Sequence, residues 1–185
     1  MREFDENIIL ETPHLILRFL KSEDRRAIYD NINHDKEVLK YYVASYTDDY
    51  DSFSIDSYIT SYKEKKMYFL AIIEKQSNQV IGNIFQISRP NAYMRSSEIG
   101  YAIGKKHWNK GYMSEALKVF INLLFESGVH KVFACHISEN KASGRVMEKC
   151  GMIYEGRRKD ELYYHERYWD CDYYYLIGDE TWNTI

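Results

Sequence analysis

Proline, glycine and cysteine are scarce in this sequence. Two prolines and nine glycines among 185 residues argue against long disordered tails and linkers. The three cysteines, Cys135, Cys150 and Cys171, are odd in number and lack the spacing of a CxxC pair or a zinc site. We therefore expect no metal site, and we expect reduced thiols, as in cytoplasmic proteins.

A basic excess and a long apolar run are also missing. The net charge of −3 argues against a nucleic-acid partner, because such domains usually carry a basic stripe. No stretch approaches the roughly 20 apolar residues of a membrane span. The acidic residues Glu3, Asp5 and Glu6 do not fit the start of a signal peptide. The expected location is the cytoplasm, without a membrane partner.

Apolar and aromatic residues are plentiful. Hydrophobic residues make up 45% of the chain, and the 18 tyrosines favour half-buried strands. The length suits one domain with a full core, so we expect a single domain over residues 1–185. The acidic run 48–51 fits a solvated turn or, alternatively, a region that attracts a cationic substrate.

Hydrophobic periodicity predicts an α/β (α+β) fold, with one mixed, mostly antiparallel sheet of about seven strands and helices on both faces. Strands are expected at 15–20, 67–74, 80–87, 97–103, 131–137, 152–158 and 163–177, and helices near 36–42, 52–65, 112–127 and 140–149, with a further helix capped by Ser22. Phe53, Tyr58, Ile59 and Tyr62 are expected to share one helix face. The unit over residues 98–137 should be a parallel, right-handed crossover.

The turn at 106–116, Lys-His-Trp-Asn-Lys-Gly-Tyr-Met-Ser-Glu-Ala, joins a predicted strand to a predicted helix. The first N–H groups of a helix have no partner inside the helix, so such a turn suits an anion. Gly111 would let the backbone come close to a phosphate, and Lys110 and Ser114 would add contacts.

A second segment, 140–152, starts a helix just beyond the predicted strand 131–137. Asn140, Ser143 and Met147 fall on one face of that helix, because they lie at positions i, i+3 and i+7. Its polar N-terminal end suits an amide-rich ligand, while its lower part packs.

Together the two segments resemble the GCN5-related N-acetyltransferase (GNAT) superfamily, and most closely its branch that acetylates the N-termini of ribosomal proteins (RimJ/RimL-like). That branch typically shows a W-G/N-K-G-Y-x-T/S-E-A turn and an N-x-x-S-x-R-V-x-E-K-x-G-F helix, which correspond here to 108–116 and 140–152. The opening at 11–18 is similar to the branch's E-T-x-R-L-x-L-R start. The resemblance spans roughly residues 11–177.

The resemblance implies direct acetyl transfer from acetyl-CoA to a primary amine, which is a protein N-terminus or a small molecule, by a monomer or homodimer. It assigns the pyrophosphate to the turn and the pantetheine arm to the preceding strand, where one N–H would stabilise the thioester oxyanion. The implied cofactor-binding residues are Tyr101, Ala102, Ile103, Trp108, Asn109, Lys110, Gly111, Tyr112, Met113, Ser114, Asn140 and Ser143. Met113 stands where many members have glycine or alanine, and it leaves less room near the phosphate.

Amine acetylation has to remove a proton from the ammonium and stabilise the departing thiolate. Glu98 is the candidate base, with a strand carboxylate paired to arginine or lysine as the alternative. Ser143 is the candidate acid, or a hydrogen-bond donor to sulfur. Many relatives carry a tyrosine acid where this chain has Met147, which leaves Tyr154 or Tyr163 as substitutes, or electrostatic stabilisation alone.

Several other residues admit a structural or a functional interpretation. His136 is interpreted as structural and His165 as a possible substrate-side residue, while Cys135 and Cys150 are expected in the core. The tyrosines at 163, 164, 168 and 173–175 suit strand packing or an acceptor cleft. The alternative to an enzyme is an inactive CoA-binding sensor. A nucleotide-binding domain is disfavoured, because GxGxxG and GKS/T motifs are missing.

Overall fold

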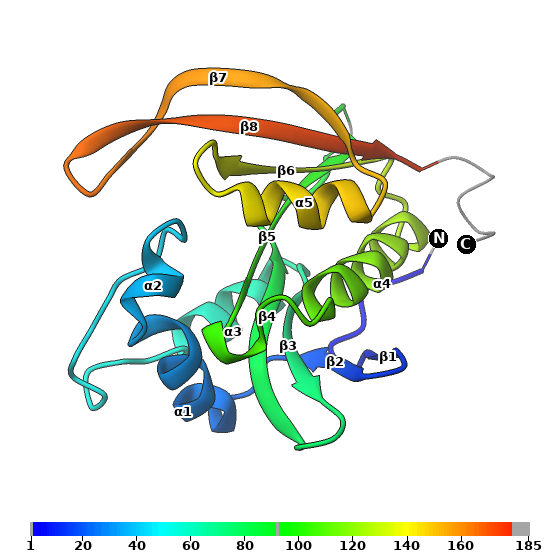
Figure 1. Cartoon of the computed structure of the whole chain (residues 1–185). Helices are drawn as coiled ribbons and strands as arrows, with labels where there is room; N and C mark the ends of the chain where they lie inside the picture. Colours follow the sequence, from blue (N-terminus) through cyan, green and yellow to red (C-terminus); the bar gives the residue numbers. More distant parts are fainter. Residues whose placement is uncertain (1, 92, 179–185) are drawn as a thin grey trace.

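One mixed sheet organises the chain, in the strand order β1-β2-β3-β4-β5-β6-β8-β7 (Figure 1). The computed structural model describes residues 2–91 and 93–178. The strands are β1 (Ile9–Glu11), β2 (Leu15–Phe19), β3 (Phe69–Glu74), β4 (Gln79–Gln86), β5 (Ser96–Ile103), β6 (Lys131–Ile137), β7 (Ile153–Tyr164) and β8 (Arg167–Ile177). The β5–β6 pair is parallel and the other pairs are antiparallel. The predicted fold class is confirmed, and so is the parallel pairing of β5 and β6, the two strands that α4 connects.

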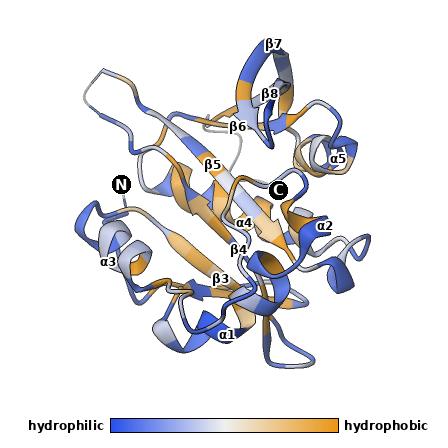
Figure 2. Cartoon of the chain, turned by 90° about the vertical axis from the view of Figure 1, so that its left-hand side faces the viewer, coloured by the Kyte–Doolittle hydropathy of each residue, from blue (hydrophilic) through white to orange (hydrophobic). Residues whose placement is uncertain are grey.

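Helices cover both faces of the sheet, with α4 and α5 on the face opposite α3 (Figures 1 and 2). The helical segments are η1 (Ser22–Asp24), α1 (Arg25–Ile28), η2 (Tyr29–Asn33), α2 (Lys36–Leu39), α3 (Asp56–Glu64), η3 (Lys105–His107), α4 (Tyr112–Glu126) and α5 (Lys141–Lys149). Among these segments, none is long and apolar enough to cross a membrane.

Helix α4 is the main support of the sheet. Its buried face carries Ala116, Leu117, Phe120, Ile121 and Leu124 at helical spacing. The helix packs on β2, β4 and β6, so one element contacts strands on both sides of β5. Figure 2 shows the apolar residues concentrated along the central strands and the helix faces that meet them. Truncating a fully buried side chain such as Phe120 to alanine costs about 3–5 kcal/mol.

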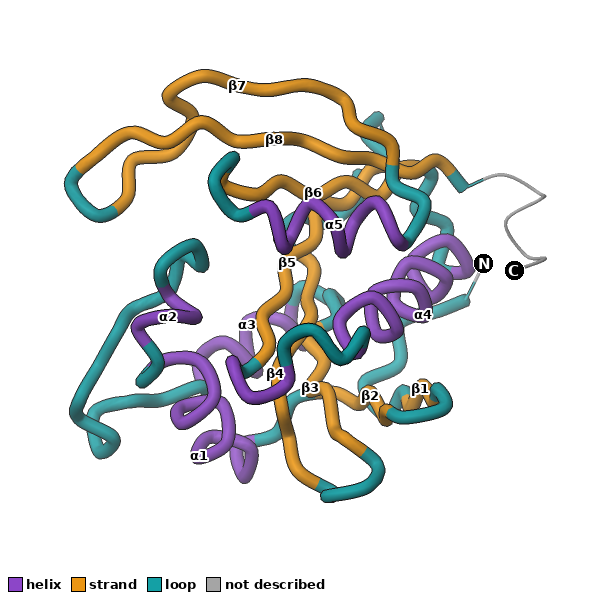
Figure 3. The backbone as a smooth tube through the Cα atoms, in the orientation of Figure 1, coloured by secondary structure: helices purple, strands orange, loops and turns teal. Residues whose placement is uncertain are grey.

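The sheet divides in its middle. β5 pairs with β6 only from Ser96 to Glu98, opposite Lys131 to Phe133. Beyond Glu98, β5 continues beside β4, while β6 continues beside β8 as far as Ile137. Figure 3 shows the result: β6, β8 and β7 run together above, while β5 descends with β4 and β3. We call the space between the diverging strands the gap.

The structure corrects the predicted ends of the sheet. β1 was not predicted, because three residues are too short to show a periodicity. The predicted strands 152–158 and 163–177 leave 159–162 as the turn between them. The two strands instead turn at His165 and Glu166, which both have positive φ (51° and 59°). The polar residues 159–161 form instead an irregular stretch within β7, where the register shifts between Arg158 and Leu162.

The early helices also differ from the prediction. Ser22 is not a cap; the Lys21 N–H donates to the Asp24 carboxylate (2.9 Å), and Ser22 donates to Asp56. The expected helix 52–65 is shorter, and its Tyr58 is 58% exposed, so it does not share the buried face of Ile59. The acidic run 48–51 forms a solvated turn, because the Asp49 carboxylate accepts N–H groups at 51 and 52.

Candidate functional site

The turn between β5 and α4 is shaped by backbone conformation. Asn109 (φ 61°) and Gly111 (φ 83°) both adopt the left-handed region, and Gly111 is the residue before the first turn of α4. The Glu115 N–H donates to the Gly111 carbonyl (3.0 Å), so the N–H groups of residues 112–114 precede the helix ladder. A Cβ placed at Gly111 would have no atom within 4 Å. The start of α4 is therefore open to an anion.

A backbone carbonyl of β5 and a side chain of β3 fix this turn in place. The Trp108 indole N–H donates to the Ile103 carbonyl (2.9 Å), which folds the ring back onto the end of β5. The Glu74 carboxylate, 8% exposed, accepts from Ser77 (2.7 Å) and from the Tyr112 hydroxyl. These two hydrogen bonds lower the pKa of Glu74. Glu74 was not singled out by the sequence, because no motif links the end of β3 to the turn.

Glu115 in the first turn of α4 joins the turn to the N-terminal segment. Its carboxylate accepts from the Thr12 hydroxyl and from the His14 backbone N–H (2.9 Å), and it contacts His14 Nδ1 (2.9 Å). Burial opposes ionisation, but the bonds from Thr12 and His14 outweigh it and lower the pKa of Glu115. The opening at 11–18 and the turn at 108–116 therefore meet in the fold.

Basic side chains surround the turn, although the chain as a whole is acidic. Lys105, Lys106 and Lys110 are exposed, and Lys110 Nζ lies 5.7 Å from the centre of the Tyr112 ring. Burial lowers the pKa of His107, which keeps that ring neutral near pH 7. The lysines and the helix dipole therefore place positive potential on the same small surface.

The edge of β5 faces the gap with its backbone. The Gly104 N–H donates to the Ile81 carbonyl of β4 (2.9 Å). Hydrogen-bonded positions alternate along an antiparallel pair, so the N–H and C=O groups of Tyr101 and Ile103 point away from β4, toward the gap. Those of Ala102 point to β4. All three residues are predicted to bind pantetheine. Tyr101 and Ile103 thus present backbone groups to the gap, whereas the backbone groups of Ala102 face β4.

Glu98 sits where the two halves of the sheet part. It is half-buried, and its Oε1 lies 3.9 Å from the Cys135 thiol. Burial raises the pKa of Glu98, against the nearby Arg158 charge. Arg158 makes its ion pair with Glu161 (3.0 Å), so Glu98 is not the partner in a strand salt bridge with it. A carboxylate with a raised pKa suits a general base.

Helix α5 brings the second segment to the far side of the gap. The Asn140 side chain caps the helix by accepting the Ser143 N–H (3.3 Å), as its position predicts. The Ser143 hydroxyl takes no part in the cap and lies 2.9 Å from the Tyr101 hydroxyl on β5. Met147 is 1% exposed and packs in the core, on the α5 face predicted to pack.

Met113 also packs in the core, so its side chain does not crowd the open surface of the turn. The two substitute tyrosines lie on β7: Tyr154 contacts the ring of Tyr174 and Tyr163 that of Tyr168. His165 is exposed in the β7–β8 turn.

The buried thiols and His136 are placed largely as expected. His136 is buried, and its Nδ1–H donates to the Ile137 carbonyl (2.7 Å). Cys150 is buried and donates to the Ser114 carbonyl (3.3 Å), but Cys135 is half-buried beside Glu98 rather than in the core. All three cysteines are free thiols.

The tip of the β7–β8 hairpin contacts the segment after α2 (Figure 1). The Tyr164 hydroxyl lies within hydrogen-bonding distance of the carbonyls of Leu39 (3.1 Å) and Tyr42 (3.2 Å). The Trp169 indole N–H donates to the Tyr164 carbonyl (2.7 Å), and the Trp169 ring meets Tyr41 edge-on. We call these interactions the hairpin contact.

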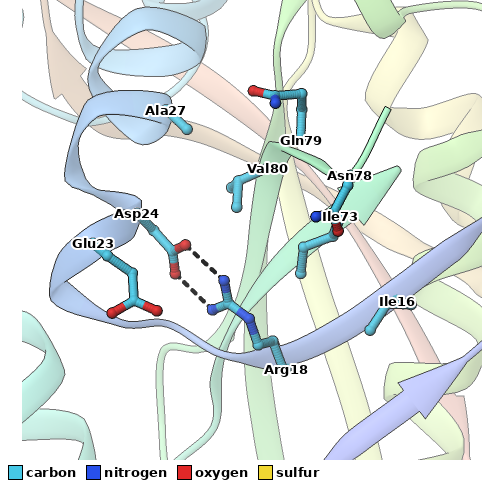
Figure 4. Close-up of a pocket in the computed structure, with 9 residues that line it drawn as sticks. All are labelled: Ile16, Arg18, Glu23, Asp24, Ala27, Ile73, Asn78, Gln79 and Val80. Atoms are coloured by element: carbon cyan, nitrogen blue, oxygen red, sulfur yellow. Dashed lines mark hydrogen bonds and ion pairs between the residues drawn. The ribbon is translucent and has the colours of Figure 1, made fainter. Parts of the chain in front are cut away.

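A surface hollow of about 320 Å³ lies elsewhere, between β2, α1 and the β3–β4 turn (Figure 4). Arg18, which lines the hollow, donates to both carboxylate oxygens of Asp24 (2.7 Å each). Asp24 is 4% exposed. The pair satisfies its own charges and holds η1 to β2. None of the predicted site residues lines this hollow.

Curated relatives match between about half and nearly all of the chain. The uncharacterized N-acetyltransferase YnaD of Bacillus subtilis is 29% identical over 177 residues, which cover 94% of this chain and 99% of that protein. The [ribosomal protein uS5]-alanine N-acetyltransferase of Escherichia coli is 28% identical over 104 residues, covering 55% of this chain and 53% of that protein.

Solved structures share the fold. A GNAT-family acetyltransferase from Bacillus anthracis superimposes with a TM-score of 0.79 at 27% identity, covering 92% of this chain and 98% of that one. The spermidine N-acetyltransferase of Vibrio cholerae, in complex with CoA and spermine, gives 0.77 at 22% identity, covering 90% and 96%. Residues 14–153 match the model of the acetyltransferase (GNAT) domain, so the chain belongs to the GNAT family of acetyltransferases.

Proposed function

We propose that this chain transfers the acetyl group of acetyl-CoA to a primary amine, with the pyrophosphate at the β5–α4 turn and Glu98 as the base. The observation that carries the proposal is the open, left-handed Gly111 at the start of α4, beside the part of the β5 edge that no longer pairs with β6. GNAT acetyltransferases use acetyl-CoA, and the turn, the lysines and the gap fit its charge and its extended shape.

On the donor side, the N–H groups at the start of α4 and the side chain of Lys110 hold the phosphates. The N–H and C=O groups of Tyr101 and the N–H of Ile103, which point to the gap, align the pantetheine arm, and Asn140 adds a contact from α5. Acetyl-CoA supplies an activated thioester carbonyl. An N–H of the β5 edge is placed to stabilise the negative oxygen that forms as the amine attacks.

On the acceptor side, Glu98 removes the proton from the attacking ammonium, directly or through water. Its raised pKa strengthens it as a base, and its position where β5 and β6 separate supports this role. Ser143, across the gap, donates a hydrogen bond to the departing sulfur. Met147 supplies no hydroxyl for this role.

Two acceptor classes have support. The Escherichia coli relative modifies the alanine of a ribosomal protein, which favours a protein N-terminus and the RimJ/RimL-like branch. The Vibrio cholerae neighbour acts on spermidine, which favours a polyamine. Either acceptor and the free thiols suit a cytoplasmic protein.

The test is an assay of CoA release with an amine panel, together with titration of acetyl-CoA by calorimetry. The panel contains spermidine, spermine and short peptides that begin with alanine or serine, and mass spectrometry identifies the acetylated product. Turnover of one class supports the proposal and selects the acceptor. Tight binding of acetyl-CoA without acetylation of any of these amines would favour the CoA-binding sensor instead.

A further inference from the structure

A pair of hydroxyl groups spans the gap. The Tyr101 hydroxyl, from β5, lies 2.9 Å from Ser143 Oγ in the first turn of α5 and 3.3 Å from the Ser143 carbonyl. Tyr101 lies on the part of β5 that no longer pairs with β6, and Ser143 lies on α5, the helix that follows β6. Tyr101 therefore crosses the gap to contact the candidate hydrogen-bond donor directly.

The chemistry of the tyrosine decides how protons are arranged in this pair. Burial raises the pKa of the Tyr101 hydroxyl far above its ordinary range. A hydroxyl that stays protonated is a permanent donor, and the nearer acceptor is Ser143 Oγ. When Ser143 Oγ accepts a hydrogen bond from Tyr101, the hydrogen of the serine hydroxyl remains available for another acceptor.

The surroundings of Ser143 limit its other interactions. Its backbone N–H is taken by Asn140, through the side-chain oxygen (3.3 Å) and the carbonyl (3.1 Å). One turn further along the same helix face, Met147 is buried and offers no hydroxyl. Among the described residues, the hydroxyl that contacts Ser143 is that of Tyr101.

We propose that the Tyr101 side chain is a positioning residue that orients the Ser143 hydroxyl toward the thioester sulfur. The inference rests on the proposed function. Glu98 takes one proton from the ammonium and releases it to water, and the neutral amine nitrogen then bonds to the carbonyl carbon and passes its second proton to Glu98. The C–S bond then breaks and its electron pair stays on sulfur, which accepts the hydrogen bond from Ser143 and later takes a proton from water. Tyr101 and Ser143 keep their own protons throughout.

The test compares Tyr101→Phe, Ser143→Ala and the double variant, with the best amine of the panel as acceptor. Because the tyrosine acts through the serine, we expect kcat to fall on the order of tenfold in Tyr101→Phe and on the order of 10–100-fold in Ser143→Ala. The double variant should be no slower than Ser143→Ala. KM for acetyl-CoA and Kd for CoA should stay unchanged in all three variants. Loss of a purely structural contact would change these two constants as well.

Tyr93→Phe is the matched control, because it removes a hydroxyl from a side chain that is 97% exposed in the β4–β5 loop. It should behave as wild type. Ser143→Thr keeps the hydroxyl and should retain most of the turnover lost in Ser143→Ala. This pair also tests the proposal if Tyr101→Phe does not fold.

Three outcomes would overturn the inference. These are wild-type kcat in folded Tyr101→Phe, full additivity of the two substitutions, and wild-type kcat in Ser143→Ala. In each of them the transferase function stands, because the wild-type protein still acetylates the amine. Failure of the wild-type protein to acetylate any amine of the panel would overturn the proposed function and the inference with it.

Discussion

The β5–α4 turn and the hairpin contact are stabilised differently. Backbone conformation forms the turn, whereas side-chain hydrogen bonds form the hairpin contact. The turn depends on backbone: two left-handed residues, Asn109 and Gly111, and the free N–H groups of a helix start. The hairpin contact depends on side chains, with the Tyr164 hydroxyl at the carbonyls of Leu39 and Tyr42. A turn made by local backbone leaves a compact pattern in the sequence. A contact between residues 125 positions apart leaves none.

The comparison predicts that substitutions at the turn weaken donor binding and that substitutions at the hairpin contact do not. The largest effect is expected at Glu98, where β5 and β6 separate. Glu98→Gln should lower kcat on the order of 10²–10⁴-fold without changing the affinity for acetyl-CoA, because it removes the base. Glu23→Gln, an exposed carboxylate on η1, is the control.

The pH profile sharpens this test. A base acts in its ionised form, so wild-type kcat/KM should fall as the pH drops through the raised pKa of Glu98. The residual activity of Glu98→Gln should lack this acidic limb. An unchanged limb in the variant would assign the titration to another group.

Gly111→Val tests whether the turn binds the donor. The side chain enters the open space in front of α4 and strains a φ of 83°, so Kd for acetyl-CoA, measured by calorimetry, should rise on the order of tenfold or more. Gly128→Val imposes comparable strain at the other end of α4, where φ is 89°. The two variants should lose similar stability, about 1–2 kcal/mol, but Gly128→Val should bind acetyl-CoA normally. Equal affinities would move the pyrophosphate away from this turn.

Tyr164→Phe tests the opposite region. Loss of the hydrogen bonds to the segment after α2 should lower the free energy of unfolding by about 1 kcal/mol. If the hairpin contact shapes the acceptor side, KM for the amine should rise while Kd for acetyl-CoA stays constant. Tyr168→Phe, on the same hairpin and 64% exposed, is the control for both measurements. A change in acetyl-CoA affinity would break the separation between the two regions.

The smallest effect is expected for Glu74→Gln, which tests how far side chains support the backbone turn. Losing the charge weakens the bonds from Ser77 and Tyr112, so Kd for acetyl-CoA should rise only a few-fold, on the order of 0.5–1 kcal/mol. The folded-state pKa of Glu74 is lowered, so its ionisation stabilises the fold above the unfolded-state pKa, and this stability is lost as the pH falls. Chemical unfolding at pH 7 and pH 4 should therefore show a smaller pH dependence in the variant.

The same contrast explains what the sequence predicted. The strands β2 to β6, α4 and α5 follow from periodicity, and the parallel β5–β6 pair follows from the spacing of strand, helix and strand. The motifs predicted the turn before α4 and the start of α5 at Asn140. These features depend on neighbours in the chain or on short patterns.

What the sequence did not predict depends on tertiary contacts. The polar stretch 159–161 has the composition of a turn, but the strand continues because β8 pairs on both sides of it. The roles of Glu74 and Glu115 come from partners on other elements, and the bond between Tyr101 and Ser143 requires the gap to be known first. No single segment contains that information.

The packing of α4 on β2, β4 and β6 has a thermodynamic consequence. The helix braces both halves of the divided sheet, and its N-terminus forms the turn. A ligand held there is bound only by a chain whose halves are already joined, so its binding free energy adds to the stability of the whole domain. Saturating acetyl-CoA, at about 100 times its Kd, should stabilise the fold by about 2.7 kcal/mol, so the melting temperature should report the loading of the donor site.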